Sequence, residues 1–481
     1  MSVPLHIIDV PALDSMSAES VFEAFQEQPW AILLDTCNNQ LSDGRYDIIV
    51  YSPVVKLVQE STLLVESAEQ SWQSLLNKDR ASSETEASCP FERISEIHQR
   101  FCDSVQIQEE TTLPFLCGAL GFFNYDLNTR LADIPDANPK QYSTPDSCVG
   151  IYDQSLIFDN KLNKVFCCYL DESRATEMIR LATQPLKSKA PASSTQFALS
   201  SEWTSNLSVD DYQKNLSKVD DYLHSGDCYQ INFAQRFNAS YTGSEWLAYK
   251  RLREVNKAPF SAFIRLEDAC IMSVSPERFL QVKSGQVETK PIKGTRKRAK
   301  DEFEDKKLSE ELLHSEKDRA ENLMIVDLLR NDLSKHCLPH SVKVPALFAL
   351  ESYPAVHHMV STVLGELKAD ATPLTLLKGA FPGGSITGAP KIRAMQIIQE
   401  LEPDKRSIYC GSIGYIGVRQ DMDTNICIRT VLAENNNLYC WAGGGIVLDS
   451  DISAEYQESL DKVAKILPVL AESLEVPFTH E

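Results

Sequence analysis

The chain has 481 residues, 43% of them hydrophobic, which is enough for a large core and suggests two or more structural units. Its 47 basic and 68 acidic residues leave a net charge of −21, so we expect neither nucleic acid nor a membrane surface as a partner. The 13 cysteines contain no Cys-x-x-Cys pair, and no stretch approaches the roughly 18 apolar residues of a membrane span. Together with the absence of a signal-like N-terminus, these features predict a cytoplasmic globular protein with reduced thiols.

The first part of the chain is typical of short strands separated by turns. Two apolar runs, 30–35 and 47–58, have strand character, whereas 79–89 is polar and indicates an exposed loop. The stretch 183–205 combines Pro, Lys and Ser without periodicity, which is typical of a linker. We therefore expect two domains, 1–185 and 205–472.

The second part mixes strands and helices without regular alternation. Ser208 is a candidate N-cap for a helix that ends at Gly226. Alternating patterns predict strands and periodic charged patterns predict helices; the strands are 228–237, 271–282 and 410–418, and the helices are 301–333 and 453–467. This mixture predicts the α+β fold class.

The last of these helices carries charged residues on one face. Glu455 and Glu458 are three residues apart, and Lys462 follows four residues after Glu458. An isolated pattern of this kind most often marks a solvated face. Three glycines lie just upstream, where their backbone N–H groups can approach an anion: Gly443, Gly444 and Gly445. Carboxylates beside such a segment favour a site for a carboxylate ligand bridged by Mg²⁺.

Lys293 stands in a basic segment, 290–298, between an apolar dipeptide and a glycine. It fits either a solvated basic loop or a lysine kept partly neutral by burial and nearby cations, and so available as a nucleophile. Downstream, 381–391 is glycine-rich but has Ala389 and Pro390 where a phosphate-binding loop needs Lys and Ser or Thr. We interpret it as a turn that lines a substrate site.

An ordered set of motifs between about 205 and 470 resembles the chorismate-utilising enzyme family. The motifs are SVSPERF, PIKGTRKR, DLLRNDLS, HHMVSTVLGEL, FPGGSITGAPKIRAM, YCGSIGYIG, NICIRT and AGGGIVLDSDISAEYQESLDKV. The N-terminal part resembles the companion domain of the anthranilate synthase component I group. The resemblance implies two large, mostly antiparallel sheets packed together with helices outside and an active site between them.

The same resemblance implies roles for particular residues. Glu321 and Glu458 would bind Mg²⁺, with Glu455 close by, and Glu277 would be the general acid that protonates the departing C4 hydroxyl of chorismate. The remaining residues would orient the substrate or line its pocket: Tyr409, Arg429, Lys462, His358, Gly443, Gly444 and Gly445.

Two positions bear on which nucleophile the enzyme delivers. Family members that use water carry a lysine base where this chain has Gln230, which favours ammonia here. Anthranilate synthases, which aminate C2, read Pro-Ile-Ala-Gly-Thr where this chain has Lys293, and a lysine there is typical of members that aminate C4. The resemblance implies a covalent intermediate on Lys293.

Ammonia would come from a separate glutamine amidotransferase subunit, because no glutamine-hydrolysing constellation is evident in this sequence. Relatives also have a tryptophan pocket, and the residues at its positions are Thr36, Asp43, Gly44, Arg45, Tyr46, Pro259, Phe260 and Ser261. A structural role and a binding role for these residues are equally compatible with the sequence. The alternatives for the whole protein are an anthranilate synthase component I and a non-catalytic subunit that binds tryptophan or an amidotransferase.

Overall fold

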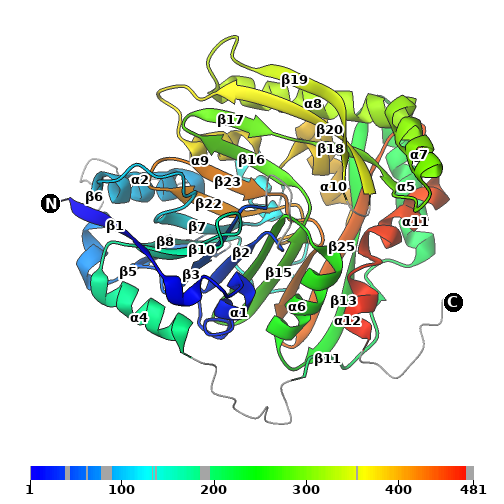
Figure 1. The fold of residues 1–481 in the computed structure, drawn as a ribbon. Helices are drawn as coiled ribbons and strands as arrows, with labels where there is room; N and C mark the ends of the chain where they lie inside the picture. Colours follow the sequence, from blue (N-terminus) through cyan, green and yellow to red (C-terminus); the bar gives the residue numbers. More distant parts are fainter. Residues whose placement is uncertain are drawn as a thin grey trace.

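The computed structural model describes residues 2–37, 44–60, 63–76, 89–132, 134–135, 138–184, 196–353 and 356–472. Two large sheets form the body of the protein (Figure 1). Every pairing within them is antiparallel in the described residues except that of β1 with β6. This confirms the expected α+β class and the two mostly antiparallel sheets.

Sheet A has 14 strands. Along its main path they are β11 (Ala198–Leu199), β13 (Gln230–Thr242), β25 (Asn437–Ile446), β24 (Thr430–Glu434), β15 (Ala269–Ser275), β14 (Phe260–Arg265), β2 (Ile32–Asp35), β3 (Tyr46–Val50), β9 (Gln154–Asp159), β10 (Lys164–Tyr169), β1 (Val3–Asp9) and β6 (Val105–Ile107), while β12 (Thr204–Ser205) and β21 (Gly388–Ala389) pair with β13.

Sheet B has 11 strands. They are β18 (Ile292–Lys297), β20 (Val356–Glu366), β17 (Gln286–Thr289), β16 (Arg278–Lys283), β23 (Met422–Asn425), β22 (Ser412–Gly417), β7 (Gly118–Phe123), β8 (Ser147–Tyr152), β4 (Val55–Glu60) and β5 (Leu63–Ala68), while β19 (Lys343–Ser352) pairs with β20.

Helices surround the sheets (Figure 1). They are α1 (Ala18–Phe22), α2 (Pro90–Asp103), α3 (Asn128–Leu131), α4 (Glu172–Thr183), α5 (Val209–His224), α6 (Glu245–Asn256), α7 (Glu302–His314), α8 (Glu316–His336), α9 (Pro373–Ala380), α10 (Lys391–Leu401), α11 (Ile452–Val463) and α12 (Leu467–Ala471), with short 3₁₀ turns η1 (Pro11–Leu13), η2 (Gln70–Leu75), η3 (Tyr125–Leu127) and η4 (Gly384–Ile386). None of the described helices is both long and apolar enough to cross a membrane.

Strand alternation sends the side chains of sheet A into two separate cores. Ile264 and Ile271 face the core between the two sheets, whereas their neighbours Phe263 and Met272 face a second core beneath α1, α4, α6 and α12. Successive strand residues point to opposite faces, so a sheet covered on both sides is apolar throughout. A third, smaller core joins α5 and α10 to β13.

The local predictions for helices hold with small changes. Ser208 caps α5 by accepting a hydrogen bond from the backbone N–H of Asp211 at 3.1 Å. The predicted helix 301–333 is two helices, because Ser315 ends α7 and its side chain caps α8. The last predicted helix, 453–467, ends earlier, since α11 stops at Val463.

The predicted strand 271–282 is wrong in one respect that matters for the site. It is two strands: β15 belongs to sheet A and β16 to sheet B, with Pro276 and Glu277 at the crossing. Proline has no N–H to donate, so a ladder readily ends there. The run 47–58 divides in the same way, into β3 and β4.

The parts of the chain before and after 183–205 build the same sheets. In sheet A β2 pairs with β14, and in sheet B β7 pairs with β22. The parts 1–185 and 205–472 are therefore segments of the chain that each supply strands to both sheets.

Candidate active site

The residues predicted to act on chorismate come from segments far apart in sequence. Helix α8 contacts β18 and the turn η4, helix α11 contacts β25, and η4 also contacts β25. These contacts bring together the end of sheet A and the end of sheet B, and the polar side chains described below lie between them.

Lys293, in β18, is directed inward rather than into a solvated loop. Its Nζ donates a hydrogen bond to the backbone oxygen of Ser385 at 3.3 Å. Burial lowers the pKa of Lys293, while the carboxylates of Glu321 and Glu277 act to raise it. Its basic neighbour Lys290 instead pairs with a surface carboxylate. Of the two interpretations, the structure supports the lysine with a lowered pKa.

Glu277 lies at the crossing between the sheets, with only 7% of its surface exposed. Burial raises its pKa to about 7, against the opposing effects of Lys293, a hydrogen bond from the backbone N–H of Ile292, and the hydroxyl of Ser385. The Ser385 hydroxyl lies 3.5 Å from Glu277 Oε1. A carboxyl group with a pKa near neutrality is protonated often enough to act as a general acid.

Arg429 lies near both Glu277 and His358, and electrostatic interactions contribute to the pKa values of Arg429 and His358. Burial lowers the pKa of Arg429, and Glu277 acts to raise it. Burial, reinforced by Arg429, lowers the pKa of His358 to about 4, so His358 is neutral at pH 7. A ring nitrogen of His358, Nδ1, lies 2.8 Å from the hydroxyl of Thr295. The structure thus places Arg429 close enough to both His358 and Glu277 for their charges to interact.

Two of the three predicted metal ligands converge beside Gly444. A Cβ built there would lie 3.2 Å from Glu455 Oε2, 3.7 Å from Glu458 Oε1 and 3.3 Å from Lys462 Nζ. Lys462 pairs with Glu458 at 2.7 Å and donates to the backbone oxygen of Gly443 at 2.9 Å. A side chain at this position would fill the space into which the two carboxylates and the ammonium group project.

The carboxylates are balanced by lysines. Lys317, at the start of α8, lies 3.6 Å from Glu455 Oε1. Burial raises the pKa of Glu321, with Lys293 and Lys317 opposing. The pKa of Glu458 is lowered: burial opposes this, but the pairing with Lys462 outweighs it.

The donors fit Mg²⁺ in chemistry and charge, because all three are carboxylates, the oxygen ligands that this cation prefers. Within the described part of the chain no three His, Cys, Asp or Glu side chains form a compact metal-binding group. Lys317 pairs with Glu455 and Lys462 pairs with Glu458, so these carboxylates stabilise positive charge beside them. The arrangement therefore offers suitable ligands but no preformed cage.

Gln230 is fully buried, and neither Oε1 nor Nε2 of its side chain has a hydrogen-bond partner. Its amide packs over Gly445, where an added Cβ would lie 2.3 Å from Nε2. A buried polar group without a partner costs about 1–3 kcal/mol, which a bound ligand can offset. The segment Gly443–Gly445, whose backbone N–H groups the sequence offers to an anion, is the extended end of β25 and pairs with β13.

Arg406 is a structural residue of the site that no sequence pattern singles out. It is buried and pairs with Glu402, and it donates to the backbone oxygens of Ile386 (3.1 Å) and Asn232 (2.7 Å). Tyr409 packs between Arg406, 5.7 Å from its ring centroid, and Trp441. The Glu-Arg spacing of four residues looks like an ordinary surface helix pair.

Two further residues of the site, Ser385 and Lys317, have little or no signal in the sequence. Ser385 lies in the glycine-rich segment 381–391, and the interpretation of this segment as a turn that lines a substrate site is the only sequence signal for it. Lys317 has none, because its approach to Glu455 depends on how α8 packs.

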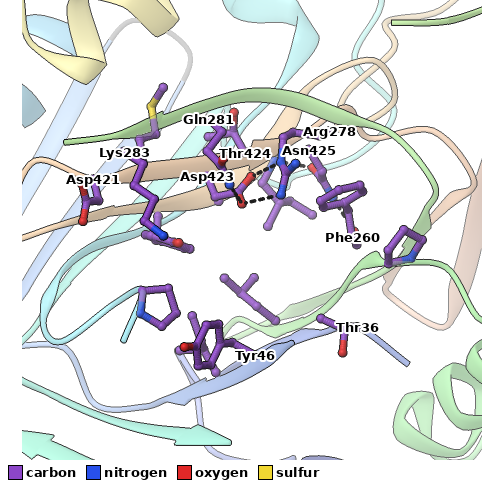
Figure 2. A pocket seen from close by; sticks show the side chains of 18 of the residues that line it. Thr36, Tyr46, Phe260, Arg278, Gln281, Lys283, Asp421, Asp423, Thr424 and Asn425 are labelled. Carbon is purple, nitrogen blue, oxygen red and sulfur yellow. Dashed lines mark hydrogen bonds and ion pairs between the residues drawn. The ribbon is translucent and has the colours of Figure 1, made fainter. Parts of the chain in front are cut away.

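A separate cavity of about 470 Å³ lies between the two sheets. Figure 2 shows Thr36 and Tyr46 on one side and Gln281, Lys283 and Asp423 on the other. Among the other residues that line the cavity are Arg45, Pro259, Phe260, Ser261 and Arg278. Glu277, Lys293 and the predicted metal ligands do not line it.

Most residues of the expected tryptophan pocket therefore do meet at one cavity. Gly44 lies beside it, its backbone oxygen accepting a hydrogen bond from Thr36 at 3.3 Å. Asp43 lies outside the described residues. On the far wall Arg278 is held by Asp423 through two hydrogen bonds of 2.9 and 3.1 Å (Figure 2).

The chain is similar to several known proteins. It is 46% identical to aminodeoxychorismate synthase component 1 of Klebsiella aerogenes, over 94% of this chain and 96% of the relative. It is 35% identical to anthranilate synthase component 1 of Aquifex aeolicus, over 79% of each chain. The crystal structure of anthranilate synthase component I from Streptococcus pneumoniae matches with a TM-score of 0.74 and 30% identity, covering 89% of this chain and 93% of that one.

A model of the chorismate binding enzyme family matches residues 60–468, which include Glu277, Lys293 and the three predicted metal ligands. The chain belongs to the chorismate binding enzyme family.

Proposed function

We propose that this protein aminates chorismate at C4 to give 4-amino-4-deoxychorismate, with Lys293 as a covalent nucleophile. The observation that carries the proposal is the facing pair of Lys293, whose pKa is lowered by burial, and Glu277, whose pKa is raised to about 7. The similarity to aminodeoxychorismate synthase components 1 supports the choice of reaction.

The first step uses both groups at once. The Lys293 amine forms a bond to C2, the conjugated double bonds of the ring shift, and the C4–O bond breaks. Glu277 transfers its proton to the departing oxygen, which leaves as water, and the lysine nitrogen becomes a positively charged adduct. Splitting one hard substitution into two displacements is the usual gain of covalent catalysis.

The second step reverses the shift. Ammonia forms a bond to C4, the double bonds move back, and the C2–N bond breaks so that Lys293 leaves as a neutral amine. The new C4 ammonium gives its proton to the Glu277 carboxylate, which restores the acid. Chorismate and ammonia are consumed, and aminodeoxychorismate and water are formed.

Substrate binding follows from the charges around the two reacting groups. Arg429 and Lys462 would orient the two carboxylates of chorismate. Glu321, Glu455 and Glu458 would hold a Mg²⁺ ion, which would supply positive charge for a substrate carboxylate. This arrangement would let a protein with a net charge of −21 bind a dianion.

We infer a separate glutamine amidotransferase subunit as the source of ammonia. Gln230 supports ammonia over water as the nucleophile, because a carboxamide cannot act as the base that water needs. Its unpartnered amide offers both a donor and an acceptor beside Gly445.

The test is the product formed from chorismate, Mg²⁺ and ammonium, identified by liquid chromatography and mass spectrometry. We expect 4-amino-4-deoxychorismate. Anthranilate as the main product would overturn the proposal in favour of amination at C2, and no loss of chorismate would favour a non-catalytic binding subunit.

The cavity between the sheets supports a second proposal, that it binds tryptophan. Its apolar wall, with Pro259 and Phe260, would contact an indole ring, and its polar wall would contact the amino acid groups. Isothermal titration with tryptophan and with alanine tests this: saturable heat with tryptophan alone is expected, and no heat with tryptophan would overturn it.

A further inference from the structure

Ser385 contacts both reacting groups through different atoms. Its backbone oxygen accepts a hydrogen bond from Lys293 Nζ at 3.3 Å, and its hydroxyl donates to Glu277 Oε1 at 3.5 Å. The residue is buried and lies in the short turn η4, which belongs to neither sheet. One serine therefore spans the distance between the amine and the acid.

The turn that carries Ser385 is fixed on several sides. The hydroxyl of Thr387 donates to the backbone oxygen of Gly383 at 3.0 Å, and Arg406 donates to that of Ile386 at 3.1 Å. The side chain of Leu328, on α8, fills the space beside Gly384, where an added Cβ would lie 2.2 Å from it. The backbone of Ser385, and with it the carbonyl that accepts from Lys293, consequently has little freedom to move.

Each contact has a chemical consequence. A neutral amine has two N–H bonds and one lone pair, so a carbonyl that accepts one N–H restricts the direction of the lone pair. A hydroxyl that donates to a carboxylate stabilises its ionised form and limits the rise of its pKa. The other groups that face Glu277 are the amino group of Lys293 from β18, the guanidinium of Arg429 from the residue before β24, and the N–H of Ile292.

We propose that Ser385 is a positioning residue that fixes the Lys293 amine relative to the Glu277 acid and tunes the protonation of that acid through its hydroxyl. The proposal rests on the function proposed above. It assigns to the glycine-rich turn 381–391 a role in holding the reacting groups as well as lining the pocket.

The test is the pH dependence of kcat/KM for chorismate in Ser385→Ala, which removes the hydroxyl and keeps the carbonyl. Since the acid must be protonated, activity falls as pH rises through the pKa of Glu277. Loss of a donor to the carboxylate should move this alkaline limb upward by roughly one pH unit. We expect kcat to fall about tenfold while KM changes less than about twofold.

Ser385→Cys and Thr387→Val complete the design. The thiol is a weaker donor, so Ser385→Cys should give an intermediate shift, and it carries the test if Ser385→Ala fails to fold. Thr387→Val removes a hydroxyl that braces the same turn without touching Glu277, so it should lower the rate and leave the limb in place.

An unshifted limb in both Ser385 variants would overturn the proposal. An equal shift in Thr387→Val would overturn it too, because turn integrity would then explain the effect. These outcomes differ from failure of the proposed function, which appears in the wild-type protein as anthranilate formation or as absence of turnover.

Discussion

At the residue scale, the site depends on two groups whose pKa values burial moves toward each other. Burial lowers the pKa of Lys293 and raises that of Glu277, because each loses the water that stabilises its charge. Opposite pKa shifts of this kind are what the proposed acid and nucleophile roles require.

Replacing Lys293 with alanine should therefore lower amination by a factor of roughly 10³ or more, with glutamine-derived and free ammonia alike. Initial rates of aminodeoxychorismate formation measure this. Lys290→Ala is the matched control, since Lys290 pairs with Glu351 at 2.7 Å and should leave the rate unchanged. Near-normal rates in Lys293→Ala would contradict the covalent mechanism.

Glu277 also predicts a pH dependence of stability. Its folded pKa of about 7 lies above its ordinary value of 4.5, so the folded state holds a proton that the unfolded state releases between these values. The contribution of Glu277 to the free energy of unfolding is fully present below about pH 4.5 and is lost as pH rises through about 7. Glu277→Gln should remove that loss and most of the activity.

Urea unfolding of wild type and Glu277→Gln at several pH values between 4 and 8 measures this difference. The difference between the two proteins at each pH cancels the contribution of other buried acids, such as Asp126, whose pKa burial also raises to about 7. A constant difference across the whole range would contradict a raised pKa at Glu277.

At the element scale, helix α11 positions Glu455 and Glu458 through its first turns. Asp451 caps the helix by accepting a hydrogen bond from the backbone N–H of Ala454 at 2.8 Å. Ser450, just before the cap, donates to Glu455 Oε1 at 2.7 Å. The start of the helix therefore sets where its two carboxylates lie.

Asp451→Ala should cost about 1 kcal/mol of stability and raise the Mg²⁺ concentration for half-maximal rate by up to roughly tenfold. Asp171→Ala is the matched control, because Asp171 caps α4 by accepting from Ser173 and Arg174 at 2.8 and 3.1 Å. It should cost similar stability without altering the Mg²⁺ requirement. An unchanged requirement in both variants would argue against α11 as the metal-binding helix.

At the scale of the whole molecule, the two parts of the chain depend on each other. Separating them would expose the edges of β14 and β22, which β2 and β7 cover. It would also divide the core that lies between the sheets. Unpaired edges and apolar surface of this kind favour aggregation.

We therefore expect a fragment of residues 196–481 expressed alone to be insoluble or to unfold without a cooperative transition. Co-expression with residues 1–184 should restore a complex that elutes as one species in size-exclusion chromatography and unfolds in one transition by circular dichroism. A fragment 196–481 that folds cooperatively by itself would contradict this dependence.

The sequence by itself determined the local elements and the family. The cap at Ser208, the strand that became β13, and the carboxylates on one face of α11 follow from patterns within a few residues, which propensity and periodicity report directly. The ordered motifs were enough to indicate the family and its two-sheet fold.

Only the tertiary structure decided which environments these residues occupy. It divided 271–282 between two sheets and so buried Glu277 at their junction, and it turned Lys293 inward toward Ser385. It brought Lys317 of α8 against Glu455 of α11 and left the Gln230 amide without a partner. Burial and long-range contacts set charge, protonation and satisfaction of hydrogen bonds, and none of these is a property of a local sequence pattern.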